Sequence, residues 1–146
     1  MKLPILKNPN EILRKKSAPL KEITPEIQRL ILDMAQTMKT ADGIGLAAPQ
    51  IGRNIRLIVI NTKNGPVALI NPKFTYKSFR KLIDEEGCLS VPGTWGKVKR
   101  CKSVRVKALN KNGKELKFKA EGMFARVLQH EVDHLDGILF IDKLVK

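Results

Sequence analysis

The stretch Gln129-His130-Glu131-Val132-Asp133-His134-Leu135 carries the strongest structural signal in this sequence. Its two histidines stand four residues apart, so a helix places both imidazoles on one face, where each can direct a ring nitrogen at the same ion. We expect this helix to run from about Met123 to Leu135, because Asp136-Gly137 is a typical helix stop. The stretch therefore predicts both a helix and a metal site.

The predicted helix has one arc that suits a water-shielded site. At about 100° per residue, Met123 and Val127 share the arc of the two histidines, and Glu131 lies beside it with Phe124 and Leu135. The opposite side is expected to carry the polar residues Arg126, Gln129, Asp133 and Asp136. A helix with two hydrogen-bonded core imidazoles is the alternative, although neutral imidazole is the commonest metal ligand.

A catalytic ion usually has three protein ligands, so the two histidines leave one ligand to be found. Cys88, within Glu85-Glu86-Gly87-Cys88-Leu89-Ser90, is the best candidate, because a thiolate binds divalent cations and Gly87 permits a close backbone approach. A lone cysteine is more often a small buried hydrophobe, and we apply that interpretation to Cys101. The expected ligand set is Cys88, His130 and His134.

The rest of the chain predicts one α+β domain over residues 1–146. Thr24 can cap a helix that begins at Pro25 and stops near Asp42-Gly43. The segments that follow are expected to be a loop over 43–50, a hairpin of strands 55–61 and 67–70 that closes at Asn71-Pro72, and a second hairpin of strands 104–108 and 116–120. We expect antiparallel or mixed sheets packed around the central metal-binding helix.

The formal net charge is +14, from 28 Lys and Arg residues against 14 Asp and Glu residues. Lysines and arginines alternate with apolar residues along the second predicted hairpin, so much of this charge is expected on one exposed sheet face. Such a face attracts polyanions. Aromatic residues make up only 5% of the chain, which leaves few platforms for base stacking, and we expect no specific DNA binding. A solvated lysine-rich surface is the simpler interpretation.

The amino-terminal run Met1–Lys7 is too short in apolar residues, and is broken by Pro4, for a secretory signal or a membrane span. Two cysteines do not make a disulfide framework. We therefore expect a reducing cytoplasm and no membrane partner.

Three segments, in order, resemble the signature motifs of the peptide deformylase family. They are Gly43-Ile44-Gly45-Leu46-Ala47-Ala48-Pro49-Gln50, then Glu86-Gly87-Cys88-Leu89-Ser90, then Gln129–Leu135. A bare His-Glu-x-x-His is shared with many zinc peptidases, whereas this trio is far more specific. The similarity also takes in the first helix and both hairpins.

The resemblance implies a bacterial-type enzyme that removes the formyl group from the N-formylmethionine of newly made proteins and releases formate. It implies that Cys88, His130 and His134 hold one divalent ion, with Fe²⁺ expected as the native metal and Zn²⁺, Ni²⁺ or Co²⁺ as alternatives. Metal-bound hydroxide is then expected to attack the formyl carbon while Glu131 handles the proton. Gln50 and the Leu89 N–H are expected to face the formyl oxygen.

The segment Gly43–Gly45 is expected to pair with the bound peptide, with Ile44 lining a methionine pocket and Gly87 beside it. A tight turn that merely requires glycine is the simpler alternative for Gly43–Gly45. Gly93 and Trp95 make the loop after Cys88 idiosyncratic. Arg100 is expected to be an unpaired surface residue, with an ion pair to Glu86 or Asp133 as the alternative.

Two rival functions are weighed beside the deformylase. One is a metallopeptidase that cuts internal peptide bonds, and the other is a basic ribosome- or RNA-binding module with a structural metal. The chain stops soon after the predicted metal helix, where many bacterial relatives continue into a further helix that can help them dock on ribosomes. The basic surface around Lys97, Lys99, Arg100, Lys102, Arg105 and Lys107 is expected to take over that contact. An organelle or viral source stays open.

Overall fold

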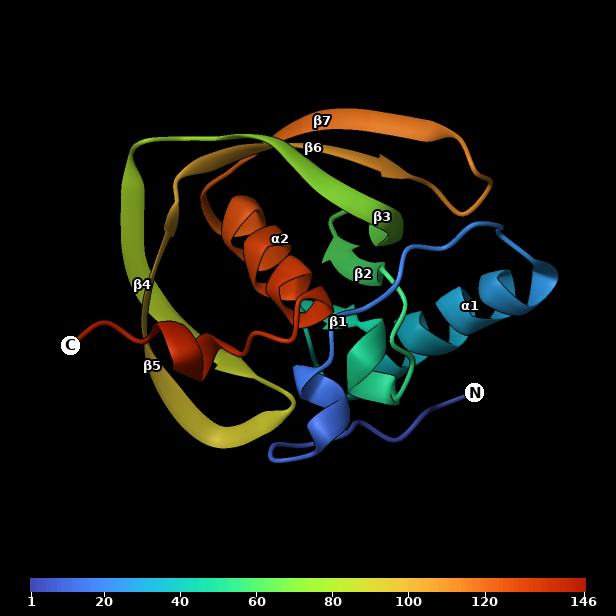
Figure 1. Cartoon of the computed structure of the whole chain (residues 1–146), viewed down its shortest axis with the longest axis horizontal. Coiled ribbons are helices and arrows are strands. Elements are labelled where there is room, and N and C mark those ends of the chain that lie inside the picture. The colour runs from blue at the N-terminus through green and yellow to red at the C-terminus, as the bar shows by residue number, and fades with distance from the viewer.

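The computed structural model describes all 146 residues, which form two α-helices, seven β-strands and three short 3₁₀ helices (Figure 1). In chain order the elements are η1 (Glu11–Arg14), α1 (Pro25–Thr40), β1 (Gly45–Ala47), η2 (Ala48–Ile51), β2 (Leu57–Thr62), β3 (Gly65–Lys77), β4 (Lys81–Cys88), β5 (Val91–Cys101), β6 (Ser103–Leu109), β7 (Glu115–Glu121), α2 (Gly122–Leu135) and η3 (Phe140–Lys143). An α+β domain with antiparallel strands is thus confirmed. None of the helices is long and apolar enough to cross a membrane.

A five-stranded antiparallel sheet in the order β1-β2-β3-β6-β7 separates the two α-helices. Successive side chains of a strand point to opposite faces. Leu57 and Val59 of β2 accordingly pack in one apolar cluster with α1, whereas Ile58 and Ile60 pack in another with α2. The alternation of apolar side chains in β2 therefore fixes one helix on each face of the sheet.

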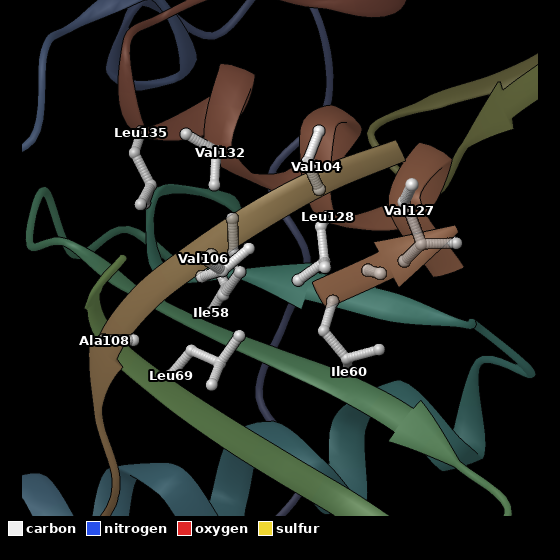
Figure 2. Packing of buried hydrophobic residues seen from close by; sticks show 13 residues of the cluster. Ile58, Ile60, Leu69, Val104, Val106, Ala108, Val127, Leu128, Val132 and Leu135 are labelled. Carbon is white, nitrogen blue, oxygen red and sulfur yellow. The ribbon is translucent and has the colours of Figure 1, made fainter. Parts of the chain in front are cut away.

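The cluster beneath α2 sets the position of that helix. Figure 2 shows Leu128 of α2 above Ile58 and Ile60, with Leu69 of β3 and Val106 of β6 beside them, and each of these five side chains is at most 1% exposed. Full burial of such a side chain contributes about 1.5–3 kcal/mol. This packing fixes the position of α2 on the sheet, and it therefore also fixes where the polar side chains of the helix lie.

Helix α1 forms as the sequence predicts. Thr24 Oγ1 accepts a hydrogen bond from the Ile27 N–H at 3.2 Å, and Pro25 occupies the first turn, where its missing N–H costs nothing. The second predicted hairpin is also confirmed as β6–β7, in which Val104 pairs with Ala120 and Val106 with Phe118.

Residues 43–50 do not form the loop that we expected. Gly45–Ala47 is an edge strand, in which Gly45 pairs with Ile60 of β2, and Ala48–Ile51 is a 3₁₀ turn. A three-residue strand is too short to show a period of two in the sequence, so its existence depends on pairing with β2.

The first hairpin does not close at Asn71-Pro72 as expected, because β3 continues to Lys77. The register of β3 against β6 shifts between Ile70 and Lys73, and Asn71 adopts a left-handed φ of 53° within this bulge. A bulge leaves residues without ladder hydrogen bonds, which is where a strand tolerates proline.

The β4–β5 hairpin is the element that the sequence did not reveal. It forms a separate two-stranded sheet that wraps around one side of α2 (Figure 1). Five of the eight residues of β4 are exposed, so no alternation of apolar and polar residues marks the strand. Val91 and Val98 of β5 pack with Leu13, Leu139 and Phe140 in a third apolar cluster.

Because this hairpin covers the second side of α2, the helix is buried almost all around, with ten of its fourteen residues inside. Arg126 and Gln129, which we expected on a polar outer side, are only 6% and 7% exposed. Gln129 donates to the Cys101 carbonyl and accepts from the Cys101 N–H, and so ties α2 to the end of β5.

Candidate metal centre

Cys88, His130 and His134 lie together, although they come from two elements far apart in the chain. Cys88 is the last residue of β4, and the two histidines lie one helical turn apart on α2. One potential ligand atom from each residue lies within 4.8 Å of the others, and Cys88 Sγ is 3.3 Å from His134 Nε2. The convergence expected from the sequence is therefore present in the fold.

A buried carboxylate orients His130. Glu86 Oε1 lies 2.9 Å from His130 Nδ1, so a proton on Nδ1 completes this hydrogen bond and leaves Nε2 as the free ring nitrogen. Burial alone would lower the pKa of His130, but hydrogen bonds with Cys88 and Glu86 raise it to about 10. The negative groups that favour a proton on this ring also favour a cation beside it.

Glu86 is itself held by two arginines. Arg100 donates to both carboxylate oxygens of Glu86 at 3.0 Å, and Arg126 donates to Oε2 at 2.7 Å. Burial would raise the pKa of Glu86, but the bonds with His130 and Arg100 hold it well below its ordinary value. Arg100 is 4% exposed and also pairs with Asp133, so the prediction of an unpaired surface arginine is wrong.

His134 completes the cluster from a fully buried position. It is 1% exposed, and burial together with the nearby charge of His130 lowers its pKa well below 6.5. A neutral imidazole with a free lone pair is the form that binds metals. One thiol and two imidazoles form a donor set typical of zinc and iron sites, so these residues fit a divalent ion.

Glu131 projects from the same helix into the site. It is 4% exposed, and its Oε1 has no hydrogen-bond partner. Burial raises the pKa of Glu131 to about 7, and the nearby charge of His130 acts against this rise. A carboxyl group that gains and loses a proton near neutral pH suits general acid and base chemistry.

Gln50 approaches Cys88 from the 3₁₀ turn η2. Its Oε1 accepts from the Ala47 N–H at 2.9 Å, which leaves the amide Nε2 directed at Ser90 Oγ at 3.0 Å and at Cys88 Sγ at 3.7 Å. The Leu89 N–H, in the turn between β4 and β5, donates to no other backbone group. Two N–H donors thus lie beside Cys88.

A cavity of about 410 Å³ opens onto this cluster. Gly43, Ile44, Gly45 and Gly87, the residues expected to contact substrate, all line it. Gly45 packs closely against Glu131, because a Cβ there would lie 2.7 Å from Glu131 Oε2 and would displace that side chain. The tight packing of Gly45 against Glu131 argues against a glycine needed merely for a turn.

Residues 2–146 match the family model described as polypeptide deformylase. The chain belongs to the polypeptide deformylase family. A peptide deformylase of Desulfitobacterium hafniense is 50% identical over 137 residues, which cover 94% of this chain and 91% of that protein. A second, from Halothermothrix orenii, is 51% identical over 146 residues, covering 99% of this chain and 94% of the relative.

Solved structures of deformylases have the same fold. The peptide deformylase of Thermotoga maritima superimposes with a TM-score of 0.98 at 38% identity, covering 100% of this chain and 99% of that one. The Synechococcus elongatus deformylase, solved in complex with actinonin, gives a TM-score of 0.95 at 41% identity and covers 99% of this chain and 79% of that chain. The deformylase resemblance stated from three motifs is confirmed.

Sequence reasoning missed Arg126 and Ser90 and left the partner of Arg100 undecided. Arg126 donates to the carbonyls of Leu82 and Val98 as well as to Glu86, and so fastens both strands of the β4–β5 hairpin to α2. The one available signal was Arg126 itself, a charged residue within an otherwise apolar turn of a helix. Because the β4–β5 hairpin was not predicted from the sequence, no partner could be assigned to Arg126.

Proposed function

We propose that this chain is the catalytic domain, over residues 1–146, of an enzyme that hydrolyses the formyl group from the N-formylmethionine of newly synthesised proteins. The observation that carries the proposal is the Cys-His-His cluster with a buried glutamate beside it, inside a chain of the polypeptide deformylase family. The products are formate and a peptide with a free N-terminal amine.

Cys88, His130 and His134 are proposed to hold one divalent ion, with Fe²⁺ as the native metal and Zn²⁺, Ni²⁺ or Co²⁺ as substitutes. Glu86 supports this assignment, because its hydrogen bond fixes the orientation of His130. When bound, such an ion polarises the formyl oxygen and lowers the pKa of a water molecule at the site towards ~7.

Glu131 is proposed to take the proton from the attacking water and to pass it to the departing amine nitrogen. Its burial and its unpartnered Oε1 support this role, because a dry carboxylate without a competing donor is free to accept a proton. Gln50 Nε2 and the Leu89 N–H are proposed to donate to the formyl oxygen as negative charge develops on it. One such donor contributes about 3 kcal/mol of barrier lowering.

The substrate peptide is proposed to add as a strand beside β1. This strand lies at the edge of the five-stranded sheet, where one row of backbone N–H and C=O groups has no strand partner. Gly43, Ile44 and Gly45 on one wall and Gly87 on another then contact the peptide, and the methionine side chain enters the cavity.

A basic surface is proposed to associate with the ribosome through RNA phosphates. Lys97, Lys99, Arg105 and Lys107 are exposed, whereas Arg100 is buried and is withdrawn from the set expected from the sequence. Lys107 lies opposite Lys73 and Lys117 across three strands. Glu115 pairs with both Lys107 and Lys117, so this group of three lysines keeps an excess of positive charge that a polyanion would stabilise. Action on nascent chains also implies the cytoplasm as the place of work.

The test of the central proposal is formate release from formyl-Met-Ala-Ser by protein purified without oxygen, which protects a cysteine-ligated iron. We expect turnover that a chelator abolishes. Glu131→Ala should keep its metal but lose turnover by a factor on the order of 10² or more, while Glu22→Ala, which removes an exposed carboxylate outside the cavity, serves as the control. Cleavage of internal peptide bonds instead would favour a metallopeptidase.

Ribosome association has its own test. Co-sedimentation with ribosomes at low salt should fall after charge reversal of Lys97, Lys99, Lys102, Arg105 and Lys107 together. A matched reversal of five other exposed lysines, Lys2, Lys15, Lys16, Lys39 and Lys63, should leave more of the binding intact. Equal loss in both variants would reduce the interaction to general charge and would contradict a dedicated surface.

A further inference from the structure

Trp95 stands at the mouth of the proposed substrate cavity. It is the only tryptophan of the chain, and it is 68% exposed although it lines the same cavity as Cys88 and Glu131. A large aromatic side chain left in water at the opening of a site is an informative exception, because its burial by a partner would be favourable.

The indole lies directly over the backbone of Gly87. A Cβ built at Gly87 would overlap the six-membered ring of Trp95, so only glycine allows this position. Gly87 precedes the proposed ligand Cys88, and Glu86 pairs with Gly96 across the hairpin. One face of the indole is therefore fixed close to the metal cluster while much of the ring stays accessible.

The rim around Trp95 combines exposed apolar side chains with two exposed carboxylates, Asp42 and Glu85. Ile44 and Met123 also line the cavity and are 56% and 55% exposed. The chain has 28 Lys and Arg residues, yet no lysine lines this cavity and its single arginine, Arg126, is buried. The mouth is thus built for apolar side chains of a ligand rather than for acidic ones.

We propose that Trp95 is a specificity-determining residue, whose exposed indole packs on a bulky apolar side chain at one of the first two positions after the formylmethionine. This inference rests on the deformylase function proposed above. With the formyl group at Cys88 and the methionine in the cavity, the following residues leave across the cavity rim, and Trp95 is one of the exposed side chains that line it. Aromatic packing of this kind contributes a discrimination on the order of threefold to tenfold.

A purely structural role is the competing explanation, because an aromatic residue across from a strand glycine also stabilises a hairpin. The two explanations differ in what they predict. A structural role changes the stability of the protein and treats all substrates alike, whereas a specificity role changes the ratio of kcat/KM values between peptides.

The experiment compares formyl-Met-Leu-Ser and formyl-Met-Ala-Leu with formyl-Met-Ser-Ser and formyl-Met-Ala-Ser. Wild-type protein should favour the leucine peptides, and Trp95→Ala should reduce that preference by about threefold to tenfold. Trp95→Phe should retain most of the preference. Phe79→Ala is the matched control, since Phe79 is fully exposed and lies outside the cavity.

Fluorescence gives a second readout that needs no turnover. Excitation of the single tryptophan reports on Trp95 alone. We expect the Glu131→Ala variant to bind peptide and to turn it over slowly enough for the emission to be recorded. Formyl-Met-Leu-Ser should shift the emission to the blue more than formyl-Met-Ser-Ser does at saturation, because leucine shields the indole from water.

The proposal is overturned if Trp95→Ala lowers kcat/KM for all four peptides by one common factor, or if both peptides saturate without an emission shift. A loss of thermal stability with an unchanged preference would also assign Trp95 a structural role. If wild-type protein releases no formate from any peptide, the deformylase proposal fails first and this inference falls with it.

Discussion

Glu86 and its two arginine partners form a buried group of charges, and we expect its disruption to lower the stability of the protein. Glu86→Gln keeps the shape of the side chain but removes its charge, and it leaves the guanidinium groups of Arg100 and Arg126 buried with only Asp133 as a carboxylate partner. Removal of one partner from a buried ion pair costs about 3–5 kcal/mol, because the remaining charge loses its compensation. For a chain of this size that loss corresponds to a fall in Tm of roughly 10–15 °C.

The assay is urea unfolding of metal-free protein, followed by circular dichroism, with Glu85→Gln as the matched control. Glu85 is the preceding residue of the same strand but is exposed, so its substitution should change the free energy of unfolding by less than about 0.5 kcal/mol. If the two variants unfold at the same urea concentration, the buried cluster does not hold the β4–β5 hairpin on α2 and the argument is wrong.

Three further predictions concern close approaches and the metal. Gly45→Ala should lower kcat for formate release on the order of 10-fold to 100-fold with little change in Tm. The reason is that the new Cβ would lie 2.7 Å from Glu131 Oε2 and would displace that carboxylate. An unchanged kcat would contradict this position of the Glu131 carboxylate. Gly137→Ala should destabilise the protein more than Gly65→Ala in urea, since both glycines have a positive φ but only the Cβ at 137 would collide with the Arg14 carbonyl. Chelation should lower Tm in a calorimetric scan, because an ion at 1,000 times its Kd stabilises the folded state by about 4 kcal/mol, and identical scans with and without chelator would refute a bound ion.

The parts of the site that lie on regular elements could be predicted from the sequence. The spacing of His130 and His134 is meaningful only on a helix, and the apolar residues around them indicate that helix. Cys88 could be named by chemistry, since it was one of two cysteines available as a third ligand. These predictions needed no knowledge of which strands pair.

The parts that depend on long-range pairing could not be predicted. β4 has no alternation because one of its sides is solvated and the other contacts polar side chains such as Arg126 rather than an apolar core. The ion pairs of Arg100 become visible only when β5 is brought together with β4 and α2. Asn71-Pro72 was wrongly interpreted as the end of a strand, because a bulge allows β3 to continue where an Asn-Pro pair normally ends one.

X-ray absorption of the zinc-loaded protein shows whether Cys88, His130 and His134 bind one ion. We expect one sulfur neighbour at about 2.3 Å and two nitrogen neighbours at about 2.0–2.1 Å from the zinc. The sulfur signal should vanish in Cys88→Ala and persist in Cys101→Ala. A spectrum without sulfur, or one that Cys88→Ala leaves unchanged, would contradict the proposed centre.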